Sequence, residues 1–188
     1  GRWSEANPDK TPEFLHQALE YHRESLRLRE ELGSKHDIAQ SLENVATVYD
    51  LSGESATAVP YYLRALETHK KTYNLYGQAS TSGNLGLAYK AQGSFQKAEE
   101  SFLSAVSLWK AIDPDHPRLS LVYHDLGDLY LTESDKKDHR KAEEYLALAI
   151  QSYEKYKIGR YLSAAYLLLA QVYKETNQIE RARVTAQS

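Results

Sequence analysis

The sequence contains no cysteine and no methionine, and only five of its 188 residues are proline. Without cysteine, the chain cannot form disulfides, use a thiol as a nucleophile or bind zinc through thiolates. A chain without disulfides fits a reducing compartment, so we expect a cytoplasmic protein. Because the sequence begins with Gly and has no methionine at all, we also expect it to be a piece of a longer protein.

The chain also lacks a charge excess and a long apolar run. Its 23 Lys and Arg against 26 Asp and Glu give a formal net charge of -3, which excludes the basic surface that nucleic-acid binding normally needs. No apolar stretch approaches the roughly 20 residues of a membrane-spanning helix, and residues 1–10 are too polar for a signal peptide. We therefore expect neither nucleic acid nor membrane insertion, and no disorder over most of a chain with 41% hydrophobic residues.

The sequence contains an internal repeat. Four segments align on a tyrosine at separations of 40, 41 and 43 residues, and each tyrosine follows a large and a small residue at four and three positions before it. The aligned positions are Val45, Ala46 and Tyr49; Leu85, Gly86 and Tyr89; Leu126, Gly127 and Tyr130; and Leu169, Ala170 and Tyr173. A repeat of this kind indicates stacked copies of one structural unit.

A second register follows the first three of these tyrosines, in which a small residue precedes a bulky one by four positions, as in Ala98 and Phe102. Apolar residues recur at three and four positions throughout, which predicts helices only. Glycines and one asparagine mark expected helix ends or turns: Gly33, Gly77 and Gly159 as stops, and Gly53, Gly93 and Asn177 as turns within helix pairs. The predicted organisation is a polar leader (1–10), then a single array (11–188) with an orphan second helix (12–32) and repeats at about 37–76, 78–112, 117–157 and 160–188, the last one truncated.

This pattern, with large-x-x-Leu-Gly-x-x-Tyr followed eight or nine residues later by Ala-x-x-x-Phe, resembles the tetratricopeptide repeat. The match is close in TSGNLGLAYKAQGSFQKAEESF and VYHDLGDLYL. The first motif position carries Leu42, Ser82, Tyr123 and Tyr166 instead of Trp, and the period is about 40 residues rather than 34. Long-period units of this kind look like those of kinesin light chains, Pins-type polarity adaptors and bacterial Rap-type regulators.

The resemblance implies an all-α fold, a right-handed α-solenoid of antiparallel helix hairpins. Each hairpin buries its apolar face only by stacking on its neighbours, and the stack presents a concave wall. We therefore expect a non-catalytic scaffold that holds a peptide segment or a helix of a partner protein. The alternative is a regulatory or sensor domain, in which the array binds an effector and controls a flanking domain.

Helical phase predicts which residues face the concave wall. If the first helix of each pair packs through residues such as Leu42 and Tyr49, the opposite phase faces the groove. The candidates for partner binding are Glu43, Asn44, Thr47, Asp50, Asn84, Leu87, Lys90, His124, Asp125, Asp128, Leu131, Leu167, Gln171 and Lys174.

Two features of this wall suggest what it could bind. Asn44 and Asn84 each offer an amide that can pair with the backbone of an extended peptide, and in the related peptide-binding repeats an Asn commonly stands just before the Leu-Gly pair. They could equally be solvated residues with only local hydrogen bonds.

The acids of the wall, together with Leu87, Leu131 and Leu167, could select a basic peptide with apolar side chains, or could be a solvated face without a selective role. These acids are Glu43, Asp50, Asp125 and Asp128.

No motif in the sequence assembles an enzyme or a cofactor site. His124, Asp125 and Asp128 share one helical face, but no HExxH motif or phosphate-binding glycine loop accompanies them, so we expect no metal and no cofactor. The 15 tyrosines fall mostly in the packing register and indicate core packing rather than a nucleic-acid platform. The truncated last hairpin should expose the face of Tyr173 and Ala182, which would allow self-association.

Overall fold

The protein is helical throughout the part of the chain that the structure, a computed structural model, describes: residues 13–132 and 137–185. The predicted leader (1–10) lies outside this part. The helices of the described residues are α1 (Glu13–Leu32), α2 (Lys35–Leu51), α3 (Ser55–Lys71), α4 (Leu75–Ala91), α5 (Phe95–Ile112), α6 (Leu119–Thr132), α7 (His139–Lys155), α8 (Gly159–Glu175) and α9 (Ile179–Thr185).

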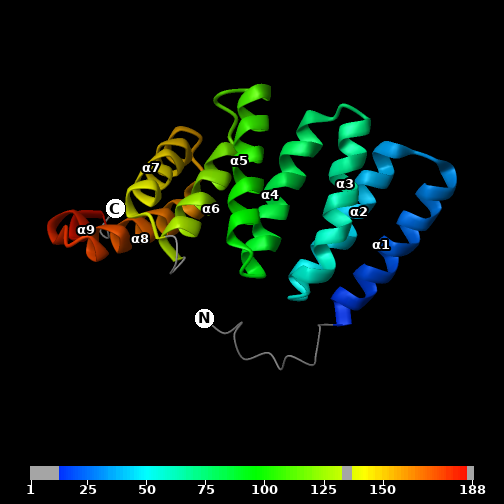
Figure 1. Ribbon diagram of the computed structural model, residues 1–188, viewed down its shortest axis with the longest axis horizontal. Helices are drawn as coiled ribbons and strands as arrows, with labels where there is room; N and C mark the ends of the chain where they lie inside the picture. The colour runs from blue at the N-terminus through cyan, green and yellow to red at the C-terminus, as the bar shows by residue number, and fades with distance from the viewer. Residues whose placement is uncertain (1–12, 133–136, 186–188) are drawn as a thin grey trace. The chain divides into compact units, whose positions relative to one another are not determined.

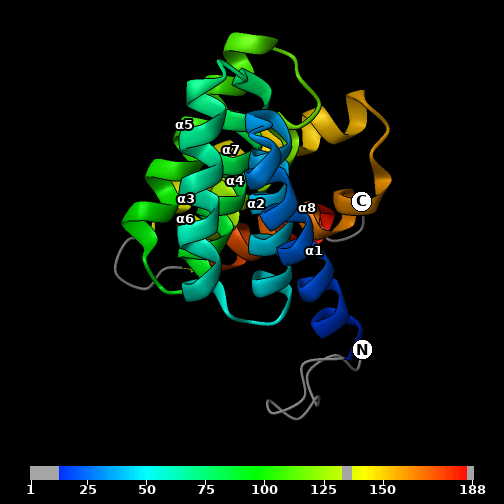
Figure 2. The same cartoon turned by 90° about the vertical axis from the view of Figure 1, so that its right-hand side faces the viewer.

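These helices fall into two compact units, with the boundary between Gln92 and Gly93. In the first unit α1 packs on α2, α2 on α3 and α3 on α4, each antiparallel to the next (Figures 1 and 2). In the second unit α5 to α9 pack in the same consecutive way, and α6 also packs on α8. The predicted all-α fold of antiparallel helix pairs is confirmed. The repeat boundaries stay a prediction.

The turns within helix pairs follow the sequence prediction. A left-handed backbone is unfavourable for most residues but not for glycine and is tolerated by asparagine. The positions predicted for these turns, and the stop predicted after the first helix, all have positive φ: Gly33 at 74°, Gly53 at 78°, Gly93 at 69° and Asn177 at 59°.

Two of the predicted helix stops are wrong. Gly77 lies in the first turn of α4, and Gly159 is the first residue of α8. The left-handed positions between those helices are taken instead by Tyr73, at φ 53°, and Lys157, at φ 54°. The sequence misleads here because neither residue is one that usually adopts this backbone.

Small residues allow the helices of a unit to approach closely. Ala58, Ala98 and Ala142 are fully buried in α3, α5 and α7. A Cβ atom at Gly127 in α6 would lie 2.6 Å from Cγ of Leu146 in α7, well inside van der Waals contact. The glycine of the repeated large-small pair is therefore required by the packing of these two helices, as the sequence predicts.

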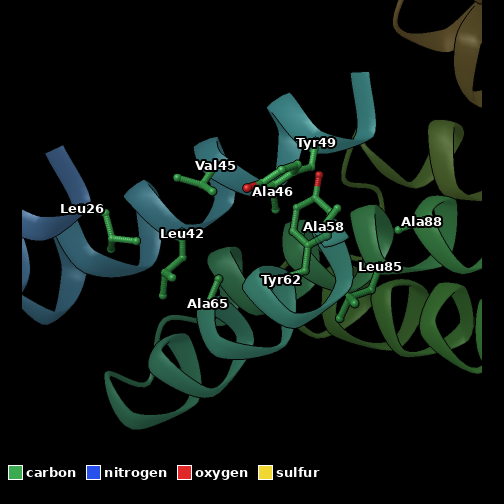
Figure 3. Packing of buried hydrophobic residues seen from close by; sticks show 10 residues of the cluster. All are labelled: Leu26, Leu42, Val45, Ala46, Tyr49, Ala58, Tyr62, Ala65, Leu85 and Ala88. Atoms are coloured by element: carbon green, nitrogen blue, oxygen red, sulfur yellow. The ribbon is translucent and has the colours of Figure 1, made fainter. Parts of the chain in front are cut away.

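The core of the first unit joins all four of its helices (Figure 3). Leu42 and Tyr49 of α2 meet Tyr62 of α3, with Leu26 of α1 at one end and Leu85 of α4 at the other, and all five are buried. Burying large side chains of this kind contributes about 1.5–3 kcal/mol each. No single hairpin could supply this core by itself.

The repeated tyrosines of the second unit tie three helices together. Tyr130 of α6 donates a hydrogen bond to Glu99 of α5, and Lys141 of α7 places its ammonium 4.6 Å from the centre of the Tyr130 ring. Tyr173 of α8 repeats the arrangement, with a hydrogen bond of 3.0 Å to Glu143 of α7 and the guanidinium of Arg181 of α9 at 4.2 Å from its ring centre. The ring is buried while its hydroxyl keeps a partner, which is the usual requirement for a tyrosine at a packing position.

A buried polar cluster joins α2, α3 and α4 in the first unit. Asn74 caps α4 by accepting from the amide of Gly77 at 2.9 Å, and its Nδ2 lies 3.2 Å from Nδ1 of His69, which is 3% exposed. Since Oδ1 of Asn74 is the acceptor for Gly77, its amide group faces the imidazole as a donor, so Nδ1 of His69 accepts. The imidazole also fills the space beside Gly77, where a Cβ atom would lie 2.3 Å from Nδ1.

Replacing Gly77 by alanine should therefore destabilise the protein. The added methyl group would overlap the buried His69 ring, and overpacking of this kind costs about 1–3 kcal/mol. Gly83→Ala is the matched control, because Gly83 lies in the same helix with nothing within 4 Å of the added Cβ, and should be neutral or stabilising by up to about 1 kcal/mol. Urea denaturation of both variants measures the difference, and equal stabilities would contradict the close packing at Gly77.

Candidate functional site

The first unit carries five of the predicted groove residues on one surface, which we call the α2–α4 surface: Asn44, Thr47, Asn84, Leu87 and Lys90. Thr47 and Leu87 are exposed, Leu87 by 45%, and the other three are partly exposed. The helices that carry them are adjacent on this side, because the Thr81 hydroxyl of α4 donates to Glu43 of α2. The surface thus combines two amides, an apolar side chain and a cation.

The two asparagines differ in the hydrogen bonds that their side chains form within the protein. The Asn44 Oδ1 atom accepts from Nε2 of Gln40, one turn earlier in α2, at 3.2 Å. No group in the described part of the chain hydrogen bonds to the Asn84 side chain, so its two donors and its acceptor are open to a ligand. Both side chains can therefore pair with the backbone of a peptide, Asn84 without giving up any bond within the protein.

Glu43 was expected to be an exposed acid of the wall, and the structure shows a different role. Its side chain is only 13% exposed, one carboxylate oxygen accepts from Thr81, and the other lies 3.6 Å from Nε2 of the buried His69. Glu43 thus completes the polar cluster of His69, Asn74 and Gly77. A carboxylate held between three helices in this way supports their packing and is not available to select a basic peptide.

Asp50, at the end of α2, is also less accessible than predicted. Burial raises the pKa of its carboxyl group, and hydrogen bonds from Ser55 and Tyr62 oppose this rise. Its Oδ1 atom is buried and has no hydrogen-bond partner among the described residues. The carboxyl group of Asp50 is accordingly a partly desolvated acid.

The second unit carries six further candidates on α6 and α8, and we call this the α6–α8 surface: His124, Asp125, Asp128, Leu167, Gln171 and Lys174. The three residues on α6 are partly exposed, while the three on α8 are exposed, Leu167 by 63%. The His124 ring meets the buried Tyr153 ring edge-on at 6.2 Å, and burial, with a smaller contribution from the charge of Asp125, raises the pKa of Tyr153.

Leu131 was expected to supply an apolar pocket of the groove, and this prediction is wrong. Its exposed fraction is 0%. It lies near the end of α6 and belongs to the buried hydrophobic core. Helical phase alone assumes a straight helix with one buried face, which fails where both faces of a short helix are covered.

A charged cluster next to the α6–α8 surface was not predicted. The carboxylate of Glu175, at the end of α8, lies 2.9 Å from Nε2 of His139 and 3.0 Å from Nζ of Lys137, and it accepts from Gln171 at 2.9 Å. These hydrogen bonds, that of His139 above all, lower the pKa of Glu175 to about 2. The partners lie 36 and 38 residues away in the sequence, so no local pattern identifies them.

The expected exposed face of Tyr173 is absent. Tyr173 is 6% exposed, because Arg181 of α9 covers its ring. The exposed apolar side chains of this end are Ile179 and Val184, at 56% and 65%. A self-association surface at this end would therefore consist of α9 and not of Tyr173.

The described residues contain no group of three or more histidines and acids placed to hold a metal ion. Among the same residues, no helix has the length and hydrophobicity needed to cross a lipid bilayer. What the two surfaces offer is therefore hydrogen bonding, charge and apolar contact.

These observations define a helical repeat protein, and its family is established by sequence. The family model of the tetratricopeptide repeat matches residues 13–71 and 77–138, so the chain belongs to the tetratricopeptide repeat family. The resemblance drawn from the tyrosine register is confirmed. Stacked repeats of this family form protein-interaction scaffolds.

Curated relatives match only part of their own length. The "Photosystem I assembly protein Ycf3" of Prochlorococcus marinus subsp. pastoris is 37% identical over 79 residues, which are 42% of this chain and 40% of that protein. The Ycf3 protein of P. marinus strain MIT 9301 is 33% identical over 107 residues, which are 50% of this chain and 57% of that protein. The chain thus spans about half the length of the curated relatives it matches.

Solved structures share the fold at low sequence identity. BtubC (BKLC) of P. vanneervenii superimposes with a TM-score of 0.84 at 22% identity, covering 93% of this chain and 71% of that chain. A kinesin-light-chain-like protein of Podospora anserina gives 0.75 at 20% identity, covering 92% and 84%. The apo form of RapI gives 0.63 at 17% identity, covering 93% and 60%. At these identities the similarity establishes the fold alone.

Removing the Glu43 carboxylate should lower stability rather than only binding. Glu43→Ala removes the carboxylate that lies beside the buried imidazole of His69 and accepts from the Thr81 hydroxyl, and a hydrogen bond to a charged group contributes about 1.5–3 kcal/mol. Glu20→Ala on α1 is the control, since Glu20 is exposed and has no partner in the described part of the chain. The midpoints of guanidinium unfolding are compared for the two variants. An unchanged midpoint for Glu43→Ala would mean that Glu43 does not stabilise the fold and is again a candidate for partner binding.

Lowering the pH should remove the contribution of the Glu175 ion cluster to the stability of the protein. A carboxyl group whose folded pKa is below its unfolded value, here about 2 against 4.5, stabilises the protein above the unfolded value and loses this contribution as pH falls toward 2. Glu175→Gln should therefore flatten the loss of stability between pH 4.5 and pH 2, whereas Glu144→Gln, at an exposed acid without an ion pair in the described residues, should not. Denaturation midpoints at pH 7, 4 and 3 test this, and identical pH profiles for the two variants would contradict it.

Proposed function

We propose that this protein is a non-catalytic interaction scaffold that binds an extended peptide segment of a partner protein on its α2–α4 surface. The observation that carries the proposal is the open Asn84 amide on α4, with the Asn44 amide on the adjacent α2. An amide side chain can bond to both the N–H and the C=O of an extended backbone, so two such groups on neighbouring helices can hold one segment. Leu87, 45% exposed on the same surface, offers contact to an apolar side chain of the segment.

The α6–α8 surface extends the proposal to a second contact. Asp125 and Asp128 on α6 supply acidic groups, and Leu167 on α8 supplies an exposed apolar side chain. Since the Glu43 side chain lies against His69 and Thr81, the acids to which we assign the selection of a basic peptide are Asp125, Asp128 and the partly buried Asp50. We accordingly propose that selection for basic residues rests on the second unit more than on the first.

The comparisons support a scaffold class and leave the partner open. The curated relatives are named for assembling photosystem I. We propose that this chain likewise brings proteins together, in the cytoplasm, and we do not carry photosystem I over as its partner because only about half of those relatives is matched. A regulatory domain that binds an effector for a flanking domain is the alternative function, and it would use the same surfaces.

The test is a capture experiment with the protein and an Asn44→Ala plus Asn84→Ala variant on lysate from its own organism, with bound proteins identified by mass spectrometry. Gln17→Ala plus Gln96→Ala is the matched control, because it removes two exposed amides on α1 and α5. For a partner peptide found in this way, calorimetry should give at least tenfold weaker binding to the asparagine variant, since two backbone groups lose partners worth about 1 kcal/mol each.

A partner that binds the asparagine variant as tightly as the unaltered protein would overturn the role of the α2–α4 surface. A small effector recovered in place of a protein would favour the regulatory alternative.

Light scattering of the protein alone measures self-association. If the exposed end of α9 forms the contact between copies, Ile179→Glu should restore a monomer.

A further inference from the structure

Helix α1 exposes an apolar face that takes no part in the two surfaces described above. It is the end helix of the first unit and packs mainly on α2 (Figure 1). Four of its large apolar side chains are exposed, more than on any other described helix: Phe14 by 64%, Tyr21 by 76%, Leu28 by 45% and Leu32 by 82%. Exposed apolar side chains that gather on one face mark an interaction site.

The spacing of this face is typical of a helix that pairs with another helix. Its residues recur alternately at four and three positions, and we call them the α1 stripe: Phe14, Ala18, Tyr21, Ser25, Leu28 and Leu32. This is the alternation of the a and d positions in a heptad repeat. The small Ala18 and Ser25 leave room between the larger side chains for those of a partner helix. From Phe14 to Leu32 the stripe rises about 27 Å, or five helical turns.

One flank of the stripe lies against α2. Arg29 donates to the hydroxyl of Ser41 in α2 at 2.7 Å, and the hydroxyl oxygens of Ser25 and Ser41 lie 3.5 Å apart. Arg23 also donates to α2, at the hydroxyl of Tyr49. These two arginines are thus bonded to α2 and do not neutralise the charges on the other flank.

The flank that faces away from α2 is acidic. It carries four acids and one arginine, all of them exposed: Glu13, Glu20, Glu24, Glu31 and Arg27. Arg27 is shared between Glu24, at 2.6 Å, and Glu31, at 2.5 Å. Four acids against one arginine leave this flank with a net charge of −3. An occupant of the stripe therefore gains affinity when the side chains beside its own apolar face are basic.

Neither residues 1–12 nor a second copy of the chain matches this stripe. Residues 1–12 contain one large apolar side chain, Trp3, and two prolines, so they cannot supply a helix with an apolar face of heptad spacing. In an antiparallel pair of α1 helices from two copies, the acidic flanks would face each other. In a parallel pair, each acidic flank would face the flank that α2 covers.

We propose that the α1 stripe binds an amphipathic α-helix of a partner protein, with lysine or arginine beside its apolar face. The apolar side chains of the partner pack on the stripe. Its basic side chains pair with Glu13 and Glu20, to which no cation among the described residues is paired. This contact recognises a helix, and it is separate from the extended segment proposed for the α2–α4 surface.

The test uses two synthetic helical peptides of three heptads, about 21 residues each. Both carry leucine at the a and d positions, and the flanking e and g positions carry lysine in one peptide and glutamate in the other. Fluorescence anisotropy should give a dissociation constant of roughly 10–100 µM for the lysine peptide, as expected for a small interface. The glutamate peptide should bind about tenfold more weakly or worse, because its acids face those of α1.

Substitutions within the stripe test the apolar contact. Tyr21→Lys plus Leu28→Lys should weaken binding of the lysine peptide about tenfold or more, because it removes two apolar contacts and adds positive charge. Leu63→Lys plus Leu103→Lys is the matched control, since it adds the same charge at exposed leucines of α3 and α5. The control should bind the peptide like the unaltered protein.

Substitutions on the acidic flank test the charge selection. Glu13→Lys plus Glu20→Lys should reverse the preference, so that the glutamate peptide binds more tightly than the lysine peptide. Glu100→Lys plus Glu144→Lys is the matched control at exposed acids of α5 and α7, and it should keep the original preference.

Equal binding of the two peptides, equal effects of the stripe variant and its control, or an unchanged preference after substitution of Glu13 and Glu20 would each overturn the proposal. A dimer in light scattering that Leu28→Lys converts to a monomer would also overturn it, because the stripe would then bind a second copy. The same holds if a longer natural chain that contains α1 fails to bind the lysine peptide, because a preceding segment would then cover the stripe.

Discussion

The close approach of adjacent helices is the constraint on which the rest of the structure depends. Gly127 leaves no room for a Cβ atom beside Leu146, and Gly77 leaves none beside His69, so in both units a side chain of one helix occupies the place of a missing side chain on its neighbour. At such distances the large residues of the register fill the space between three helices at once. A single added methyl group at either position would overlap a side chain of the neighbouring helix.

Polar groups are used differently inside and outside this packing. Glu43, His69 and Asn74 lie against one another between the helices of the first unit, and in the second unit the hydroxyls of Tyr130 and Tyr173 donate to acids of the preceding helix. The Asn84 amide, by contrast, has no partner in the described part of the chain. A polar group that is left open where others are paired is the feature expected of a binding residue, because it can gain a bond without losing one.

Under the proposed function, the α2–α4 surface offers the amides of Asn44 and Asn84 to a peptide backbone, and a contact of this kind by itself distinguishes little between partner sequences. Selection among partner side chains would then rest on the exposed Leu87 and on the proposed contact with the α6–α8 surface.

The sequence by itself determined the helical fold, the family and the packing role of the tyrosines, because each follows from a short-range period or a repeated register, as at Leu126, Gly127 and Tyr130. Only the tertiary structure decided which polar residues remain free. Glu43 and Asn44 are neighbours in sequence with the same predicted phase, yet the carboxylate of Glu43 is held by His69 and Thr81, which lie 26 and 38 residues away. The same holds for Leu131, which is buried by its surroundings, and for Glu175, whose partners come from a different helix and the turn before it. Accessibility depends on what packs against a residue, and contacts between distant segments are not encoded in any local pattern.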